Sequence, residues 1–138
     1  MIDIWFDTRE LEDLREKLSK EVVDKAITEG MKELAGRTLR SAKLNTPHDT
    51  GHLRRGWFIR NVDAEGILLK NSVSYAEYVE YGHRQNVGQY VPKLGKRLKS
   101  PWVEGKFYAR RTEDQMRRQA ASIIKPIIEK ELEKLLND

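Results

Sequence analysis

The segment 45–51, NTPHDTG, most constrains what this chain can fold into. It lies between a long helical pattern and a run rich in aromatic and β-branched residues, so it must end a helix, turn sharply and launch a strand. Thr46 precedes a proline and therefore avoids the helical region. Asp49 is expected to accept hydrogen bonds from turn amides, and Gly51 to adopt a positive φ. The predicted turn motif, a structural feature without active-site chemistry, comprises Thr46, Pro47, Asp49, Thr50 and Gly51.

A second segment, 75–82 or YAEYVEYG, places three tyrosines and a valine between acidic residues and ends on a glycine. This pattern predicts a short helical turn that presents aromatic surface and ends where a positive φ is tolerated. Tyr75 and Val79 lie four residues apart and are expected to anchor the turn on a sheet. Four large groups in seven residues exceed what one short element needs for its own core, so Tyr78 or Tyr81 is expected to be exposed in the free chain.

Two long helical patterns flank these segments. In the first, Asp7 and Glu10 resemble a capping box, and Gly30 and Gly36 are expected to allow a bend or a break. In the second, Thr112 and Gln115 stand in capping-box register, and Pro126 should kink or break the helix. Apolar residues recur at helical spacing in the first pattern at Leu11, Leu14, Leu18, Val22, Val23, Ala26, Ile27, Met31 and Leu34, and in the second at Met116, Ala120, Ile123, Ile124, Ile127, Ile128, Leu132 and Leu135.

Strands are predicted between the helices. Residues 56–62 and 67–71 are rich in β-branched, aromatic and leucine residues and are joined by a turn at 63–66, so a β-hairpin is expected. Residues 82–100, with their glycines and lysines, predict a mobile loop, and residues 102–109 a strand that returns to the sheet. The predicted fold is therefore α+β: a long N-terminal helix, a small antiparallel sheet and a C-terminal helix packed on the sheet, in one domain over residues 1–138.

Charge is concentrated in the middle of the chain. The formal net charge is +4, and the densest basic stretch holds Lys93, Lys96, Arg97 and Lys99. Three interpretations remain open for this patch: a solvated loop without a partner, a contact with an acidic protein, or a contact with phosphate backbones. No base-reading motif supports the last of these.

No constellation of residues points to catalysis or to a cofactor. The chain has no cysteine, and His48, His52 and His83 with Asp49 lie across a predicted turn, so a metal site is not expected. Glu77 and Glu80 are expected to be solvated or paired with arginines of a neighbour. No apolar run approaches the roughly 20 residues that span a bilayer, and the N-terminus lacks a basic start, so a soluble cytosolic product is expected.

Three ordered motifs carry a family resemblance. Residues 46–54 match Thr-Pro-x-Asp-Thr-Gly-x-Leu-Arg, residues 75–82 match Tyr-Ala-x-Tyr-Val-Glu-Tyr-Gly, and residues 102–109 match a late glycine-containing segment before a terminal helix. In this order they resemble the phage tail components of the HK-ninety-seven gene-product-ten type, which are related to minor tail protein Z and to tail-completion, or head–tail joining, proteins. His48 and His83 depart from the residues common in that family.

The resemblance implies a non-enzymatic structural protein of a phage or prophage virion, assembled in the host cytoplasm and acting at the head–tail junction. It implies a homo-oligomeric ring, with a hexamer expected, whose partners are other neck and tail proteins. An alternative is a basic nucleic-acid-binding module that contacts DNA on its path through the neck; a hydrolase is the least favoured interpretation. The residues expected at a partner interface are Tyr78, Tyr81, Lys93, Lys96, Arg97 and Lys99.

Overall fold

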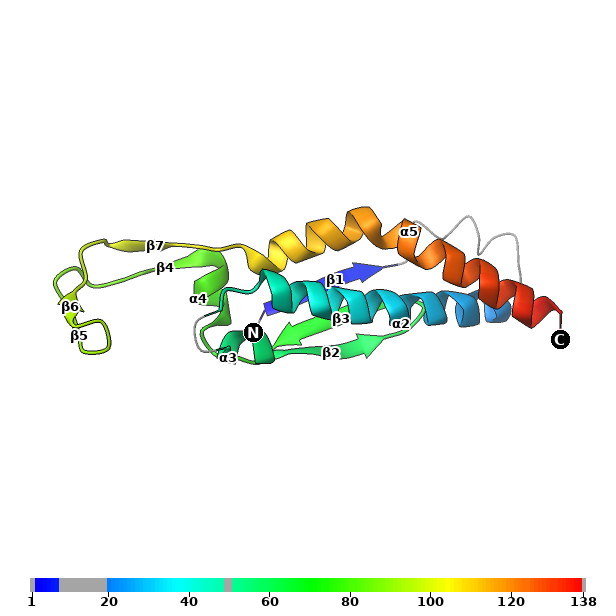
Figure 1. Ribbon diagram of the computed structural model, residues 1–138, viewed down its shortest axis with the longest axis horizontal. Helices are drawn as coiled ribbons and strands as arrows, with labels where there is room; N and C mark the ends of the chain where they lie inside the picture. Colours follow the sequence, from blue (N-terminus) through cyan, green and yellow to red (C-terminus); the bar gives the residue numbers. More distant parts are fainter. Residues whose placement is uncertain (1, 8–19, 49–50, 138) are drawn as a thin grey trace.

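A computed structural model describes residues 2–7, 20–48 and 51–137 of the chain. Two long helices lie side by side along a small sheet, and a narrow arm projects from one end (Figure 1). This is the mixed α+β architecture that the sequence predicts, with an antiparallel sheet and a C-terminal helix. The elements are β1 (Ile2–Asp7), α2 (Lys20–Asn45), α3 (His52–Arg55), β2 (Trp57–Val62), β3 (Gly66–Asn71), α4 (Ala76–Tyr81), β4 (Gly82–Arg84), β5 (Tyr90–Val91), β6 (Lys96–Arg97), β7 (Trp102–Glu104) and α5 (Tyr108–Leu136).

The main sheet has the antiparallel order β1-β3-β2. The predicted hairpin is confirmed, and its turn is closed by Asp63, whose Oδ1 accepts hydrogen bonds from the amides of Glu65 at 2.8 Å and Gly66 at 3.2 Å. Strand β1 was not predicted. It fits the period-two pattern of a half-buried strand, because Ile2 and Ile4 are buried while Asp3 and Trp5 are exposed.

The predicted start of the first helix falls mostly outside the described residues. Asp7, the proposed cap, is the last residue of β1, and its proposed partner Glu10 lies outside the described ranges, as do the apolar residues 11, 14 and 18. Helix α2 then runs continuously through Gly30 and Gly36, so the break that these glycines would allow does not occur. It ends at Asn45, immediately before the Thr-Pro pair that was predicted to stop it.

Helices α2 and α5 pack tightly because a glycine lies between them. A Cβ added to Gly30 would stand 2.7 Å from Cγ2 of Ile124 and 3.5 Å from Cγ1 of Ile128. The predicted apolar faces meet here: Ile27, Met31 and Leu34 of α2 are buried in the same core as Met116, Ile123, Ile124 and Ile128 of α5. The core therefore lies between the helix pair and the inner face of the sheet.

Helix α5 starts one turn earlier than predicted and does not stop at its proline. Thr112 is buried inside the helix, where its hydroxyl donates to the carbonyl oxygen of Tyr108 at 2.7 Å, so it is not a cap. The helix continues through Pro126 to Leu136. None of the helices in the described part of the chain is both long and apolar enough to cross a bilayer.

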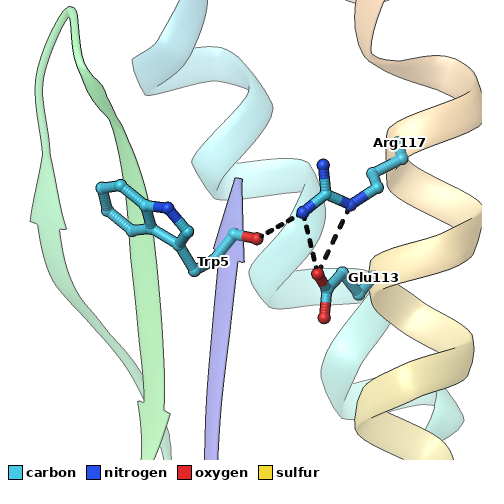
Figure 2. A network of polar contacts seen from close by, with 3 residues as sticks. All are labelled: Trp5, Glu113 and Arg117. Atoms are coloured by element: carbon cyan, nitrogen blue, oxygen red, sulfur yellow. Dashed lines mark hydrogen bonds and ion pairs between the residues drawn. The ribbon is translucent and has the colours of Figure 1, made fainter. Parts of the chain in front are cut away.

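A polar contact ties α5 to strand β1 (Figure 2). The guanidinium of Arg117 donates from Nη2 to the carbonyl oxygen of Trp5 at 2.9 Å and to Oε1 of Glu113, one turn earlier in the helix, also at 2.9 Å. The Glu113 carboxylate thus holds the Arg117 guanidinium in position to reach β1, an edge strand of the sheet. This contact fixes α5 against the edge strand β1.

The arm, defined as residues 82–104, replaces the predicted loop. Strands β4 and β7 pair antiparallel at its base, with Gly82 opposite Glu104 and Arg84 opposite Trp102, and β5 pairs with β6 near its tip. The stretch predicted as a mobile loop therefore contains paired strands. The prediction that residues 102–109 return a strand to the main sheet is wrong, since β7 pairs with β4 and residue 108 already begins α5.

Candidate partner interface

The turn motif joins the end of α2 to the start of β2. Thr46 is buried, its hydroxyl donates to the carbonyl oxygen of Ala42, and its Oγ1 accepts a hydrogen bond from Nε1 of Trp57 at 2.7 Å. Gly51 has a φ of 82°, as predicted. The chain does not pass directly into a strand, however, because the single-turn helix α3 follows Gly51. Asp49 and Thr50 lie outside the described residues, so the predicted hydrogen bonding of Asp49 stays a prediction.

Glu80 of α4 is the main surprise in the second motif. Its side chain was expected to be solvated or paired with arginines of a neighbour, yet the residue is only 1% exposed. Its two carboxylate oxygens accept hydrogen bonds from the backbone amide of Ala109, at 2.7 and 3.2 Å. The residue at the N-cap of α5, Phe107, makes no side-chain cap. Glu80 therefore caps α5 from another element of the fold, placing negative charge at the positive end of the helix dipole.

Burial has electrostatic consequences at this position. Desolvation raises the pKa of Glu80 above its ordinary value, although hydrogen bonds from the Ala109 and Arg110 amides and the positive charges of Arg111 and Arg110 act in the opposite direction. Next to it, the phenol of Tyr108 is buried and donates to the carbonyl oxygen of Ala76 at 2.8 Å. Burial raises the pKa of Tyr108 as well, so this phenol stays protonated and keeps its hydrogen bond.

Both ends of the arm are clamped against α4 through close backbone contacts. Gly82 has a φ of 87°, and a Cβ there would lie 2.4 Å from the carbonyl oxygen of Val103. A Cβ on Gly105 would lie 2.4 Å from the carbonyl oxygen of Glu80. Phe107 takes a left-handed conformation, with a φ of 49°, and its amide donates to that same carbonyl oxygen at 3.0 Å. Glycine is thus required at position 82, where the second motif ends and the arm begins.

The tyrosines of α4 surround this root of the arm. Tyr78 is 61% exposed and Tyr81 is 60% exposed, as the sequence predicts. The ring of Tyr81 meets that of Phe107 edge-on at a centroid distance of 6.5 Å. Tyr75 is not the predicted anchor: it is 40% exposed and stacks on the imidazole of His52, whereas Ala76 and Val79 pack on the core.

The predicted basic residues lie on the arm and are exposed. Arg97 braces the hairpin by donating from its guanidinium to the carbonyl oxygen of Gly88 at 2.9 Å. The stretch 84–103 contains five arginines and lysines and no acidic residue. Sequence reasoning missed the apolar side chains interleaved with these cations: Val87, Tyr90, Leu94 and Trp102 are all exposed. Their signal is the alternation of lysines with single large apolar residues from 90 to 102.

The histidines lie on different elements. His52 lies on α3, and His83 lies on β4 with its ring 5.6 Å from that of Tyr78. Within the ranges that the structure describes, no three metal-ligating side chains come together.

The comparison with protein families gives one match, to the family described as "Bacteriophage HK97-gp10, putative tail-component", over residues 9–82. The comparisons with curated proteins and with solved structures found no match. The matched range covers a little over half of the chain, includes the turn motif and α4 with its capping Glu80, and ends at Gly82, where the arm begins. The third motif, at 102–109, lies beyond it. The chain belongs to this family of bacteriophage tail components.

Proposed function

We propose that this chain is a non-enzymatic structural subunit of the head–tail junction of a phage or prophage, where it completes the tail as part of a ring, expected to be a hexamer. It would enter the virion after assembly in the host cytoplasm, with other neck and tail proteins as its partners. Family membership supports a structural role in a tail. The observation that carries the proposal further is the projecting arm. Aromatic side chains are exposed around its root, and cationic side chains are exposed along the rest of it.

The root of the arm has the composition of a protein-binding surface. Tyr78 and Tyr81 present rigid amphipathic rings with few rotatable bonds, the kind of side chain that dominates binding energy in interfaces. Phe107 and Trp102, each more than 40% exposed, extend the same surface. Isolated exposed apolar residues are ordinary, but a group of four aromatic rings at the base of a protrusion marks a contact site.

The part of the arm beyond its root carries the charged part of the same surface. Its cations are exposed on a hairpin, where they favour an acidic protein surface and speed the encounter with it. Because such contacts between exposed charges are screened by salt, the aromatic root would hold the complex and the basic arm would steer it.

The test removes the aromatic root without touching the core. In the variants Tyr78→Ala and Tyr81→Ala, the melting temperature of the isolated chain should stay nearly unchanged, because both side chains are exposed. Complementation of a phage that lacks the gene should yield unjoined heads and tails in electron micrographs. Leu44→Ala, which removes an exposed apolar residue on α2, is the matched control and should join heads to tails normally. Normal joining by both tyrosine variants, or unfolding of both, would contradict the proposal.

A second candidate function is nucleic-acid binding, favoured by Tyr90 and Trp102 among the cations of the arm, since aromatic rings beside basic residues can stack on bases. Fluorescence anisotropy with a DNA duplex over a salt series would test it. Tight binding that weakens steeply with salt, together with normal assembly by a variant in which Lys96, Arg97 and Lys99 are replaced by glutamate, would favour DNA over a protein partner.

A further inference from the structure

An acidic groove lies at the end of the molecule opposite the arm. It is open, has a volume of about 470 Å³, and is formed where the first turns of α2 lie beside the last turns of α5. Four carboxylates and one ammonium line it, so the lining is formally negative at neutral pH. Two of the carboxylates make ion pairs on the helix surface, Glu21 with Lys25 at 3.8 Å and Glu29 with Lys32 at 3.1 Å. The lining residues are Glu21, Asp24, Lys25, Thr28, Glu29 and Glu131.

The tip of the arm has the opposite character. The chain reverses between β5 and β6 through a turn in which the amides of Leu94 and Gly95 donate to the carbonyl oxygen of Val91, and Gly95 has a φ of 64°. This turn pushes out Leu94, which is 58% exposed, with Lys93 and Lys96 on either side. The tip is thus an apolar side chain flanked by cations, on a hairpin that carries no acidic residue between 84 and 103.

We propose that the tip of the arm of one copy docks in the acidic groove of a second copy of this chain. Leu94 would enter the groove, and Lys93 and Lys96 would face the carboxylates on its rim. A groove of this volume is at the small end of the range for ligand pockets and admits a few side chains. The inference rests on the proposed ring, because it names the contact that would build one.

The positions of tip and groove decide the kind of assembly. They lie at opposite ends of one molecule, so an arm cannot reach the groove of its own chain (Figure 1). Each copy would offer one tip and one groove, which makes the contact head-to-tail. A contact of this type generates a closed ring where the rotation between copies closes, and an open filament where it does not. A single tip buries little surface, so the contact should be weak between two free copies and strengthened by closure of the ring.

The chain has no cysteine, which permits a direct test by disulfide trapping. Cysteines would be introduced by Leu94→Cys on the tip and Thr28→Cys in the groove of the full chain. A disulfide forms only where the two Cβ atoms approach to about 4 Å. Under mild oxidation of the concentrated protein, the double variant should form a ladder of covalent oligomers, and an equimolar mixture of the two single variants should stop at dimers. The pair Leu44→Cys with Thr28→Cys, which places one cysteine away from the tip, should form neither.

Charge reversal is the second part of the test. In the double-cysteine background, replacing Lys93 and Lys96 by glutamate should abolish the ladder, as should replacing Glu21 and Glu131 by lysine. Combining both reversals should restore it, because the charges are again complementary. A double-cysteine variant that stays monomeric under oxidation, or a ladder that survives each single reversal, would overturn the inference. In either of these cases, head–tail joining by the tyrosine variants still decides the proposed function independently.

Discussion

At the scale of single residues, Gly51 is the position where backbone conformation decides stability. Its φ of 82° is rare for residues with a Cβ, and an added Cβ would also stand 2.7 Å from Nη1 of Arg55. Gly51→Ala should therefore destabilise the fold by about 1 kcal/mol or more. Gly36→Ala is the control, since Gly36 has no positive φ and open space around an added Cβ, and it should not destabilise the fold. Urea unfolding measures the stability of both variants. An unchanged midpoint for Gly51→Ala would contradict the claim that the conformation of this turn contributes to stability.

Glu80 predicts a pH dependence with a definite sign. Because burial raises its pKa above 4.5, the folded chain holds this proton to higher pH than the unfolded chain. Raising the pH from about 4.5 through the folded pKa therefore lowers the free energy of unfolding, and the contribution is constant outside that window. In Glu80→Gln this decline should be absent, so the stability of the variant relative to the wild type should rise across the window.

Unfolding of both proteins at a series of pH values would measure that difference. A constant difference between the Glu80→Gln variant and the wild type would show that burial does not perturb this carboxyl group.

At the scale of elements, the two glycines of α2 should respond in opposite directions to the same substitution. Gly36 has open space where a Cβ would go, so Gly36→Ala should stabilise the chain by about 0.5–1 kcal/mol through helix propensity alone. Gly30 lies against Ile124 of α5, so Gly30→Ala must push the helices apart and should destabilise the chain despite the same gain in propensity. Thermal melts of the two variants provide the comparison; equal shifts would mean that the helices are not packed as closely as the structure shows.

Elements defined by local pattern could be predicted from the sequence, and those defined by distant partners could not. The helix periodicity, the hairpin, the stop at Thr46 and the positive φ of Gly51 each depend on a few neighbouring residues. Strand β1 gains its definition from pairing with β3, about 60 to 70 positions away in the chain, and strands β4 to β7 are too short to show alternation. The start of α5 was misplaced for the same reason, since its cap comes from Glu80 and not from a neighbouring residue.

In the candidate site, too, features set by neighbouring residues could be predicted and features set by distant partners could not. The exposure of Tyr78 and Tyr81 follows from too many aromatic residues in one short helix, which the sequence reveals. The burial of Glu80 could not be predicted from the sequence. Its three-residue spacing from Glu77 is typical of a solvated helix face, and only the fold places the amide of Ala109 beside it. The basic residues were identified from composition, but only the fold shows that they lie on a projecting hairpin.

At the scale of the whole molecule, the arm and the body are nearly independent in their packing. Beyond its root, the arm is held by pairs within itself, β4 with β7 and β5 with β6, and the buried core lies entirely in the body. Stability and assembly should therefore respond to different parts of the chain: substitutions in the core should change the melting temperature, and substitutions on the arm should change the joining of heads to tails.

A shortened arm would test this separation. Arg84 and Trp102 are paired across β4 and β7, so a two-residue Asn-Gly turn can replace residues 85–101 while keeping the clamped root. We expect the melting temperature of this variant to stay within a few degrees of that of the intact chain, because a change of about 1 kcal/mol moves a domain of this size by only a few degrees. Joined particles should be lost in the complementation assay. A large drop in melting temperature would show that the arm stabilises the body, and normal joining would show that the contacts at the neck are made by the root alone.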